Sequence, residues 1–287
     1  MTEDLAVRYQ RLLAKANDYH KRALWQEKLR LLQEALNLCE DSEFPDAGAR
    51  KQELLLDLGG IWRRLGQYER AEQVLKQSLD VCSDTDPLKR ASILGELAVV
   101  FRHCSRFAEA KSASRQQFEI AHDAAPSLEA EAEMCRAIGN EGMSAYNLCQ
   151  MSDEGSGALL DHAFGQIRER IRRARELQQH VFRVDPESPL LDFARAWETI
   201  GLDRLSLLHI AAGQFEDAVK VAEESQARQS RVDPTVTAFS KFFYGHALWH
   251  NGQREQALEQ WSAPEAYAIR PRRFAKSRLR STQNGFG

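Results

Sequence analysis

The sequence predicts an all-α solenoid, a right-handed superhelix of about six antiparallel helix pairs. A turn followed by a helix start is repeated four times, beginning at Gly66, Ser105, Gly213 and Gly252. In each copy an alanine follows a small residue by twelve positions, as Ala71 follows Gly59. Good helix formers dominate the composition, and no run of alternating β-branched residues indicates a strand.

The pair of helices around Gly66 has the clearest pattern. Leu58 and Trp62 are four residues apart and mark the packed face of a first helix. Gly66 ends that helix, because glycine adopts the left-handed cap at little energetic cost. Gly59 and Ala71 are small, so the two helix backbones are expected to approach closely. The sequence therefore predicts two antiparallel helices with a tight turn between them.

This pair resembles a tetratricopeptide repeat (TPR), in which a Leu-Gly and an aromatic of the first helix pair with an alanine of the second. Three further pairs match at Leu97-Ala98 with Ala110, Leu205-Ser206 with Ala218, and Tyr244-Gly245 with Ala257. The first pair is weaker, with Lys28 at the small position. The resemblance spans residues 8–262. It implies a superhelix whose first helices line a concave groove.

The fourth pair departs most from the pattern. Residues 150–157 replace the tight turn, and a long helix is predicted from Ala158 to Val181. Its strongly basic run from Arg168 to Arg175 is interpreted as a solvated outer face with salt bridges, in preference to a patch for an acidic partner. Residues 137–143 and this basic helix also resemble repeat segments of large fungal multidomain proteins.

Two regions are expected, a repeat domain at 1–265 and a basic, disordered tail at 266–287. Setting aside the six basic side chains between Arg270 and Arg280 changes the formal net charge from −3 to −9. The repeat domain therefore lacks the charge of a general nucleic-acid binder, and nucleic acid is not an expected partner except through the tail. The tail is also the segment that would direct nuclear import, if the protein is nuclear. No apolar run approaches the ~20 residues that span a bilayer. The expected location is the cytoplasm, without a membrane partner.

The repeat register predicts which side chains face the groove. The candidate residues for binding a partner or ligand are Arg64, His103, Asn140, Met143, Asn147, Arg204, Phe242, Phe243, His246, Trp249 and His250. An asparagine here could bond a ligand backbone through both donor and acceptor. The alternative is a solvated inner wall without a ligand, and the sequence leaves both open.

The C-terminal end of the groove is unusually aromatic. Phe239, Phe242, Phe243 and Trp249 exceed what one pair needs for packing, since other apolar side chains already serve its core. The sequence does not decide between additional core and an exposed apolar recognition surface. The spacing of His246 and His250 places both on one helix face.

The motifs of several functional classes are missing. The histidine pair lacks the glutamate of a His-Glu-x-x-His site and a third ligand nearby, so no metal or cofactor is expected. No phosphate-binding loop and no nucleophile elbow occur. The carboxylate clamp of chaperone-binding TPR proteins is also missing, since Gly60 and Val99 stand at its asparagine positions. A heat-shock chaperone C-terminus is therefore not the expected partner.

The predicted function is that of a protein-interaction scaffold, which binds a peptide or protein segment in the concave groove. This prediction rests on analogy with the family. The alternative is an enzyme or small-molecule-binding protein that uses the aromatic and histidine end of the groove as its site. No set of nucleophile, base and orienting residue supports that alternative, so the chain is not expected to be an enzyme.

Overall fold

The computed structural model describes residues 5–40, 44, 46–82, 86–152, 156–228 and 234–263. The predicted tail at 266–287 lies outside these residues. The described part contains twelve α-helices, which are α1 (Leu5–Lys21), α2 (Trp25–Leu38), α3 (Ala47–Arg64), α4 (Tyr68–Asp80), α5 (Pro87–His103), α6 (Phe107–Asp123), α7 (Leu128–Cys149), α8 (Ser156–Val184), α9 (Pro189–Ala211), α10 (Phe215–Ala227), α11 (Pro234–His250) and α12 (Arg254–Ser262).

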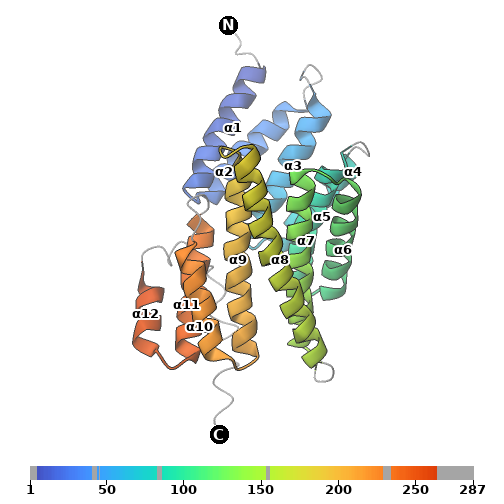
Figure 1. Ribbon diagram of the computed structural model, residues 1–287. Helices are drawn as coiled ribbons and strands as arrows, with labels where there is room; N and C mark the ends of the chain where they lie inside the picture. Colours follow the sequence, from blue (N-terminus) through green and yellow to red (C-terminus); the bar gives the residue numbers. More distant parts are fainter. Residues whose placement is uncertain are drawn as a thin grey trace.

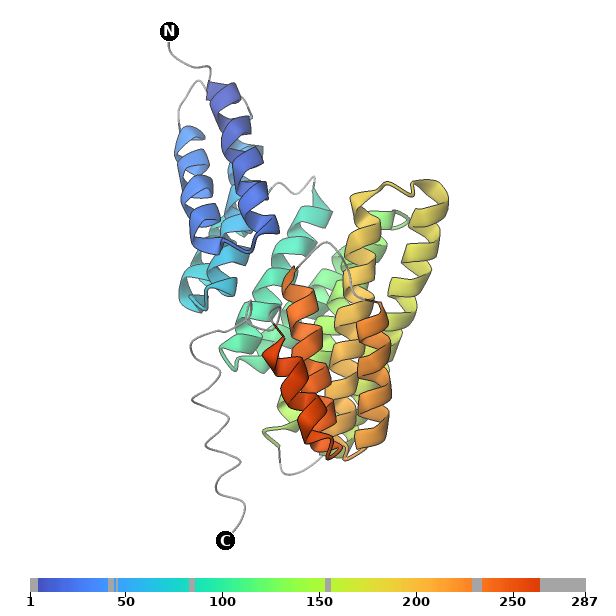
Figure 2. The same cartoon turned by 90° about the vertical axis from the view of Figure 1, so that its left-hand side faces the viewer.

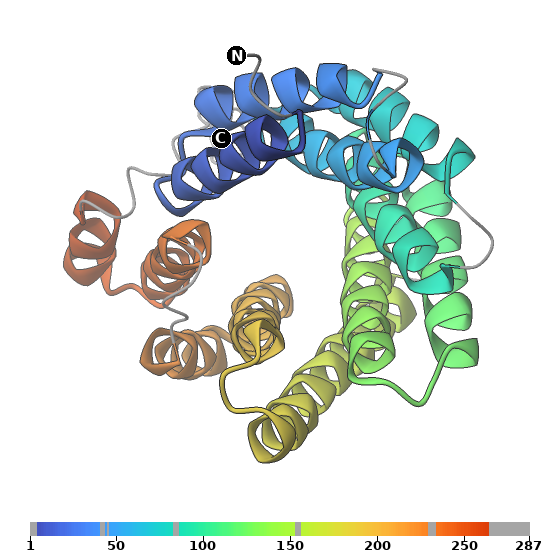
Figure 3. The same ribbon diagram turned by 90° about the horizontal axis from the view of Figure 1, so that it is seen from above.

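The helices form six antiparallel pairs that coil into a solenoid (Figure 1). Seen from above, the solenoid curves round so that α11 returns to the side of the molecule where α1 lies (Figure 3). The odd-numbered helices α3, α5, α7, α9 and α11 contact one another in that order and make the inner wall. Even-numbered helices pack behind them. The predicted all-α solenoid of six pairs is therefore confirmed.

Both ends of the solenoid lie on the same side at different heights, with α1 and α2 above α11 and α12 (Figure 2). The extensive contacts join helices that are neighbours along the chain or that occupy the same position in neighbouring pairs. Each pair is thus stabilised mainly by its neighbours, as expected for a repeat protein.

Five of the turns inside the pairs each contain one residue with a left-handed backbone. Gly66, Gly213 and Gly252 have φ angles of 74°, 72° and 82°. Ser105, which takes the place of the glycine in one copy of the repeated turn, adopts φ 61°. Ala23, in the turn of the first pair, adopts φ 53°. A side chain makes this conformation unfavourable by about 1–2 kcal/mol. The turn geometry is therefore imposed by the packing of the pair even where glycine is missing.

Replacing Ser105 by glycine should relieve this strain, and we expect Ser105→Gly to raise the free energy of unfolding by about 1 kcal/mol. Urea denaturation followed by circular dichroism measures the change. The reciprocal change Gly66→Ser should lower the free energy of unfolding by a similar amount. Equal effects of the two changes, in sign and size, would contradict a shared left-handed turn.

Small residues set the distance between the two helices of a pair. A Cβ atom on Gly59 would lie 2.5 Å from the Leu75 side chain, and one on Gly95 would lie 2.5 Å from Gln117. In the fifth pair the Ser206 hydroxyl donates a hydrogen bond to the Ala218 carbonyl at 2.8 Å. The last contact joins two residues twelve positions apart, as the sequence predicted.

We expect Gly59→Ala to lower the free energy of unfolding by about 1–3 kcal/mol, because the added methyl group overlaps Leu75 in a fully packed interior. Gly165→Ala is the matched control, since nothing lies within 4 Å of a Cβ at this position of α8. There the better helix propensity of alanine should raise the free energy of unfolding by about 0.5–1 kcal/mol. Thermal and urea denaturation of both variants test the contrast.

Lys28 is buried where the sequence pattern calls for a small residue. Its side chain is 5% exposed, and its Nζ lies 3.6 Å from Asp57 Oδ2 on α3 and 3.1 Å from His20 Nδ1. Burial lowers the pKa of Lys28, whereas the Asp57 carboxylate acts to raise it. A polar contact thus replaces the close helix approach in the first pair.

The predicted long helix of the fourth pair is confirmed as α8, which begins at Ser156 and ends at Val184. Much of its basic run is salt-bridged, as expected. Arg172 pairs with Glu169 and Glu176, each at 2.6 Å. Arg170 differs, because it is 2% exposed and turns into the structure.

Candidate functional site

One face of α11 carries a stripe of exposed aromatic side chains. Phe239, Phe242 and Trp249 are 42%, 46% and 41% exposed, and helical spacing places them on one face with His246. Leu248 lies on the opposite side of the helix, in a buried cluster shared with α10 and α12. The stripe is therefore exposed, and two of its members, Phe242 and Trp249, lie beside Trp261 of α12. We call Phe239, Phe242, His246 and Trp249 the aromatic stripe.

The aromatic residues at this end serve both the core and the surface. Phe243 is half-buried and packs on the core cluster that contains Leu205 and Leu207 of α9. Phe242 lies edge-on to Phe243 at 5.6 Å and near Trp261 at 6.5 Å, while Trp249 lies 5.8 Å from Trp261. Neighbouring rings hold the exposed ones in place, which limits the side-chain entropy that a ligand would have to remove.

His246 and His250 face each other across one helical turn. Their Nε2 atoms are 3.2 Å apart, and the His250 ring stacks on Phe215 at 5.7 Å. Burial lowers the pKa of His250, which favours a neutral ring. Within the described residues, no group of three His, Cys, Asp or Glu side chains is placed to hold a metal ion. The pair can donate or accept a hydrogen bond at the edge of the aromatic stripe.

Two candidates in the middle of the groove are mostly engaged inside the protein. Asn140 is 3% exposed, and its Nδ2 donates to the Gly95 carbonyl at 3.3 Å, which ties α7 to α5. Met143 is 8% exposed and belongs to the core cluster around Phe164. Little of either side chain is left for a ligand. Asn147, one turn further along α7, is half-buried.

Arg64 and His103 are exposed and rest on aromatic rings. The Arg64 guanidinium lies 4.7 Å from the Trp25 ring centre, and His103 stacks on Tyr68 at 4.9 Å. Desolvation and the nearby charges of Arg102 and other arginines lower the pKa of His103 well below its usual range. His103 is therefore neutral at neutral pH.

A charged network that the sequence reading missed lies beside these residues. Glu96 of α5 accepts hydrogen bonds from Arg63 of α3 at 2.7 Å and from Arg136 of α7 at 2.5 Å. Burial acts to raise the pKa of Glu96, but the two arginine charges lower it to about 2. Arg63 and Arg102 directly precede the predicted Arg64 and His103. The inner face of each helix thus includes two consecutive residues. The repeat register assigns only one of them to the groove, so the sequence analysis missed Arg63 and Arg102.

Arg204 joins this network from α9. Its Nη1 donates to the Gly139 carbonyl at 3.2 Å. The adjacent Asp203 turns away from it, is 2% exposed, and accepts hydrogen bonds from the hydroxyls of Ser225 at 2.5 Å and Ser240 at 2.8 Å. Burial raises the pKa of Asp203 to about 7.

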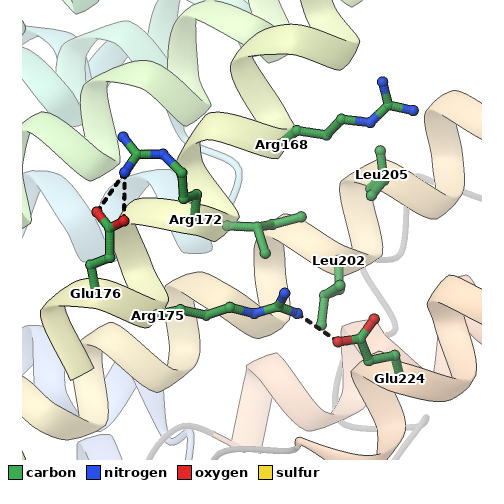
Figure 4. A pocket seen from close by; sticks show the side chains of 8 residues that line it. Arg168, Arg172, Arg175, Glu176, Leu202, Leu205 and Glu224 are labelled. Atoms are coloured by element: carbon green, nitrogen blue, oxygen red, sulfur yellow. Dashed lines mark hydrogen bonds and ion pairs between the residues drawn. The ribbon is translucent and has the colours of Figure 1, made fainter. Parts of the chain in front are cut away.

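A cavity of about 390 Å³ lies between α8 and α10, with Leu202 and Leu205 of α9 at its base (Figure 4). Its charged rim is internally paired, since Arg175 contacts Glu224 at 2.5 Å and Arg172 contacts Glu176 at 2.6 Å. Leu202 and Leu205 occupy a different face of α9 from Arg204. This cavity is thus distinct from the inner face and from the aromatic and histidine end.

Comparison with known proteins agrees with this architecture. A family model described as "Tetratricopeptide repeat" matches residues 53–84, a range that includes part of α3 and all of α4. The chain has a TPR-like repeat fold. No curated protein sequence matches it. Each described helix is too short or too polar to cross a lipid bilayer.

Solved structures resemble this TPR-like protein over most of its length. The Rap protein complexed with Competence and Sporulation Factor has a TM-score of 0.64 at 13% identity, over 93% of this chain and 73% of that one. BtubC (BKLC) from P. vanneervenii has a TM-score of 0.49 at 16% identity, over 97% and 93% of the two chains. TPR-like repeats of a putative kinesin light chain from Podosopora anserina have a TM-score of 0.43 at 17% identity, over 76% and 94%. At these identities the likeness concerns the fold, and the fungal resemblance stays a prediction.

Asp203 should make stability depend on pH. Its folded pKa of about 7 exceeds the ~3.9 of an unfolded aspartate. The free energy of unfolding should therefore fall as pH rises from about 4 to 7, by up to ~1.4 kcal/mol per pH unit, and then level off. Asp203→Asn should flatten this part of the profile, measured by urea denaturation at several pH values. Asp161→Asn, on the exposed surface of α8, should leave the profile unchanged. A persistent slope in Asp203→Asn would contradict the assignment.

Proposed function

We propose that this TPR-like protein is an interaction scaffold that holds a peptide or protein segment against the inner face of its solenoid. The observation that carries the proposal is the aromatic stripe, since three large apolar side chains are 41–46% exposed on one helix face. Apolar side chains that gather on a concave surface are typical of recognition sites. The solved Rap protein of similar fold is itself a complex, with Competence and Sporulation Factor.

The proposed mechanism is burial of apolar ligand side chains against Phe242 and Trp249. Each fully buried apolar side chain contributes about 1.5–3 kcal/mol. His246, His250 and Asn147 offer polar contacts next to this surface. Ordering a flexible peptide offsets much of the contact energy, so affinities near the micromolar range are expected.

The proposed partner is not a heat-shock chaperone C-terminus, because the clamp positions hold Gly60 and Val99. The enzyme or small-molecule alternative gains no support from the cavity, which is lined by residues of α8, α9 and α10 outside the aromatic and histidine end. The partner is therefore proposed to be a segment that presents apolar side chains.

A library of random displayed peptides tests the proposal. Peptides selected on the immobilised protein should bind it in solution, as measured by fluorescence anisotropy. Phe242→Ala with Trp249→Ala should weaken this binding about tenfold or more, because both rings are exposed on the aromatic stripe. Phe243 is better left unchanged, since it packs on the core of α9.

The matched control is Phe182→Ala with Leu258→Ala, which removes two exposed apolar side chains from the outer helices α8 and α12. This control should bind the selected peptides as the wild type does. Circular dichroism checks that both double variants fold. Selection of no peptide, or equal loss in both double variants, would overturn the proposal.

A further inference from the structure

Three arginines in the inner wall or buried directly behind it carry charges that no carboxylate balances within the described residues. They are Arg102 of α5, Arg170 of α8 and Arg204 of α9, and none of them forms an ion pair there. Guanidinium groups inside proteins are almost always paired with an acid, because an isolated buried charge is strongly unfavourable. Three such groups near one another therefore form an unbalanced positive site.

Two of the three, Arg170 and Arg204, are held in place by hydrogen bonds to backbone carbonyls. Arg170 is 2% exposed and donates from Nε to the Trp197 carbonyl at 3.2 Å. Its guanidinium passes so close to Gly139 that a Cβ there would overlap it. Arg204 donates to the Gly139 carbonyl, whereas Arg102 Nη1 is buried without an acceptor among the described residues. A guanidinium has five N–H donors, so each retains free donors after these contacts.

The groups are close enough to act on one another. Burial and the charges of Arg63 and Arg170 lower the pKa of Arg102 to about 10. Burial and the charges of Arg170 and Arg102 likewise lower the pKa of Arg204. Arg170 and Arg204 meet at Gly139, where Arg170 lies against the Cα and Arg204 bonds the carbonyl. The mutual repulsion of the three charges, including that of Arg102 on α5, agrees with this placement.

The neighbouring acids do not compensate. We define the inner arginine cluster as Arg63, Arg102, Arg136, Arg170 and Arg204. Glu96 is shared by Arg63 and Arg136, and Glu133 lies 3.9 Å from Arg136. Asp203 points to two serine hydroxyls instead. Five guanidinium groups thus face two ion-paired carboxylates, and the difference is three positive charges.

We propose that the inner arginine cluster binds a phosphate monoester group. Its dianion offsets most of the three charges, and its three oxygens can accept hydrogen bonds from guanidinium groups on different helices. A single carboxylate would leave the cluster with two positive charges. Arg102 and Arg204 are half-buried and the neighbouring His103 is exposed, so an anion reaches them from the inner face. The proposal does not depend on the aromatic stripe.

Binding of inorganic phosphate to the full chain is the first test. At constant ionic strength, replacing chloride by phosphate should raise the melting temperature and give a saturable heat in titration calorimetry, whereas acetate should not. Arg102→Gln should weaken phosphate binding about tenfold. This variant should fold, because Arg102 Nη1 loses no hydrogen bond and mutual repulsion decreases. Arg102→Gln with Arg204→Gln should abolish binding.

The matched control removes two arginines from the outer helices, as Arg30→Gln with Arg70→Gln, both exposed on α2 and α4. It should bind phosphate as the wild type does. Equal stabilisation by acetate, equal weakening in the control, or no phosphate effect in the wild type would overturn the proposal.

A second arm identifies the source of the phosphate group. An alanine-rich octapeptide with one phosphoserine is compared with free O-phosphoserine and with the unphosphorylated peptide. Tighter binding of the phosphopeptide than of O-phosphoserine assigns the site to phosphorylated chains, and equal binding assigns it to small phosphate esters. Binding of the unphosphorylated peptide at equal affinity would overturn the proposal, while leaving the role of the aromatic stripe intact.

Discussion

The close approach of paired helices is the constraint on which the rest of the structure depends. Where Gly59 meets Leu75 and Gly95 meets Gln117, the space of a methyl group is already filled by the partner helix. Backbone separation, and with it the orientation of each pair, is fixed by these contacts. Repeating nearly the same step from pair to pair curves the solenoid into the ring seen in Figure 3. The inner wall is a consequence of that curvature.

The same constraint also shapes the charged part of the inner wall. In the fourth pair the side chain that occupies the space beside a glycine is an arginine, since Arg170 lies against Gly139. Gly201 lets α9 approach from the other side, with the Arg170 Cδ 3.8 Å from a Cβ there. A position used elsewhere for hydrophobic packing thus carries a charge between two helices. The electrostatics of the wall therefore follow from a packing rule.

Local signals explain why the fold was predictable. The turn residues, the offset between Gly59 and Ala71, and the face marked by Leu58 and Trp62 each act within one pair, so the sequence states them directly. The sequence also predicted that Ser105 begins a turn, but it did not predict the left-handed backbone of this residue. Longer-range packing decides the rest, since nothing in the spacing says that the Asn140 amide is used by Gly95.

The candidate site was predictable only in part, because packing between helices distant in the sequence decides which side chains are exposed. Exposure of Phe242 and Trp249 agrees with the surplus of aromatics at this end, but the sequence could not say which rings the core would use. Arg170 stands in a run of arginines that otherwise form surface ion pairs. Its inward direction depends on Gly139 of another helix, α7, where a Cβ would overlap the guanidinium. Arg63 and Arg102 were missed because neighbouring residues share the inner face.

The way in which the odd-numbered helices contact one another in series along the inner wall has a mechanical consequence. Within the described residues, extensive contacts join helices adjacent along the chain or successive odd-numbered helices, and none of them joins α1 to α11. The two ends of the coil are therefore not held together by a large interface there. The junctions between helix pairs follow one another along the chain. A small change of angle at each junction would therefore add up to a larger change in the diameter of the coil. The diameter of the coil is thus set jointly by all the junctions and fixed by no single one of them.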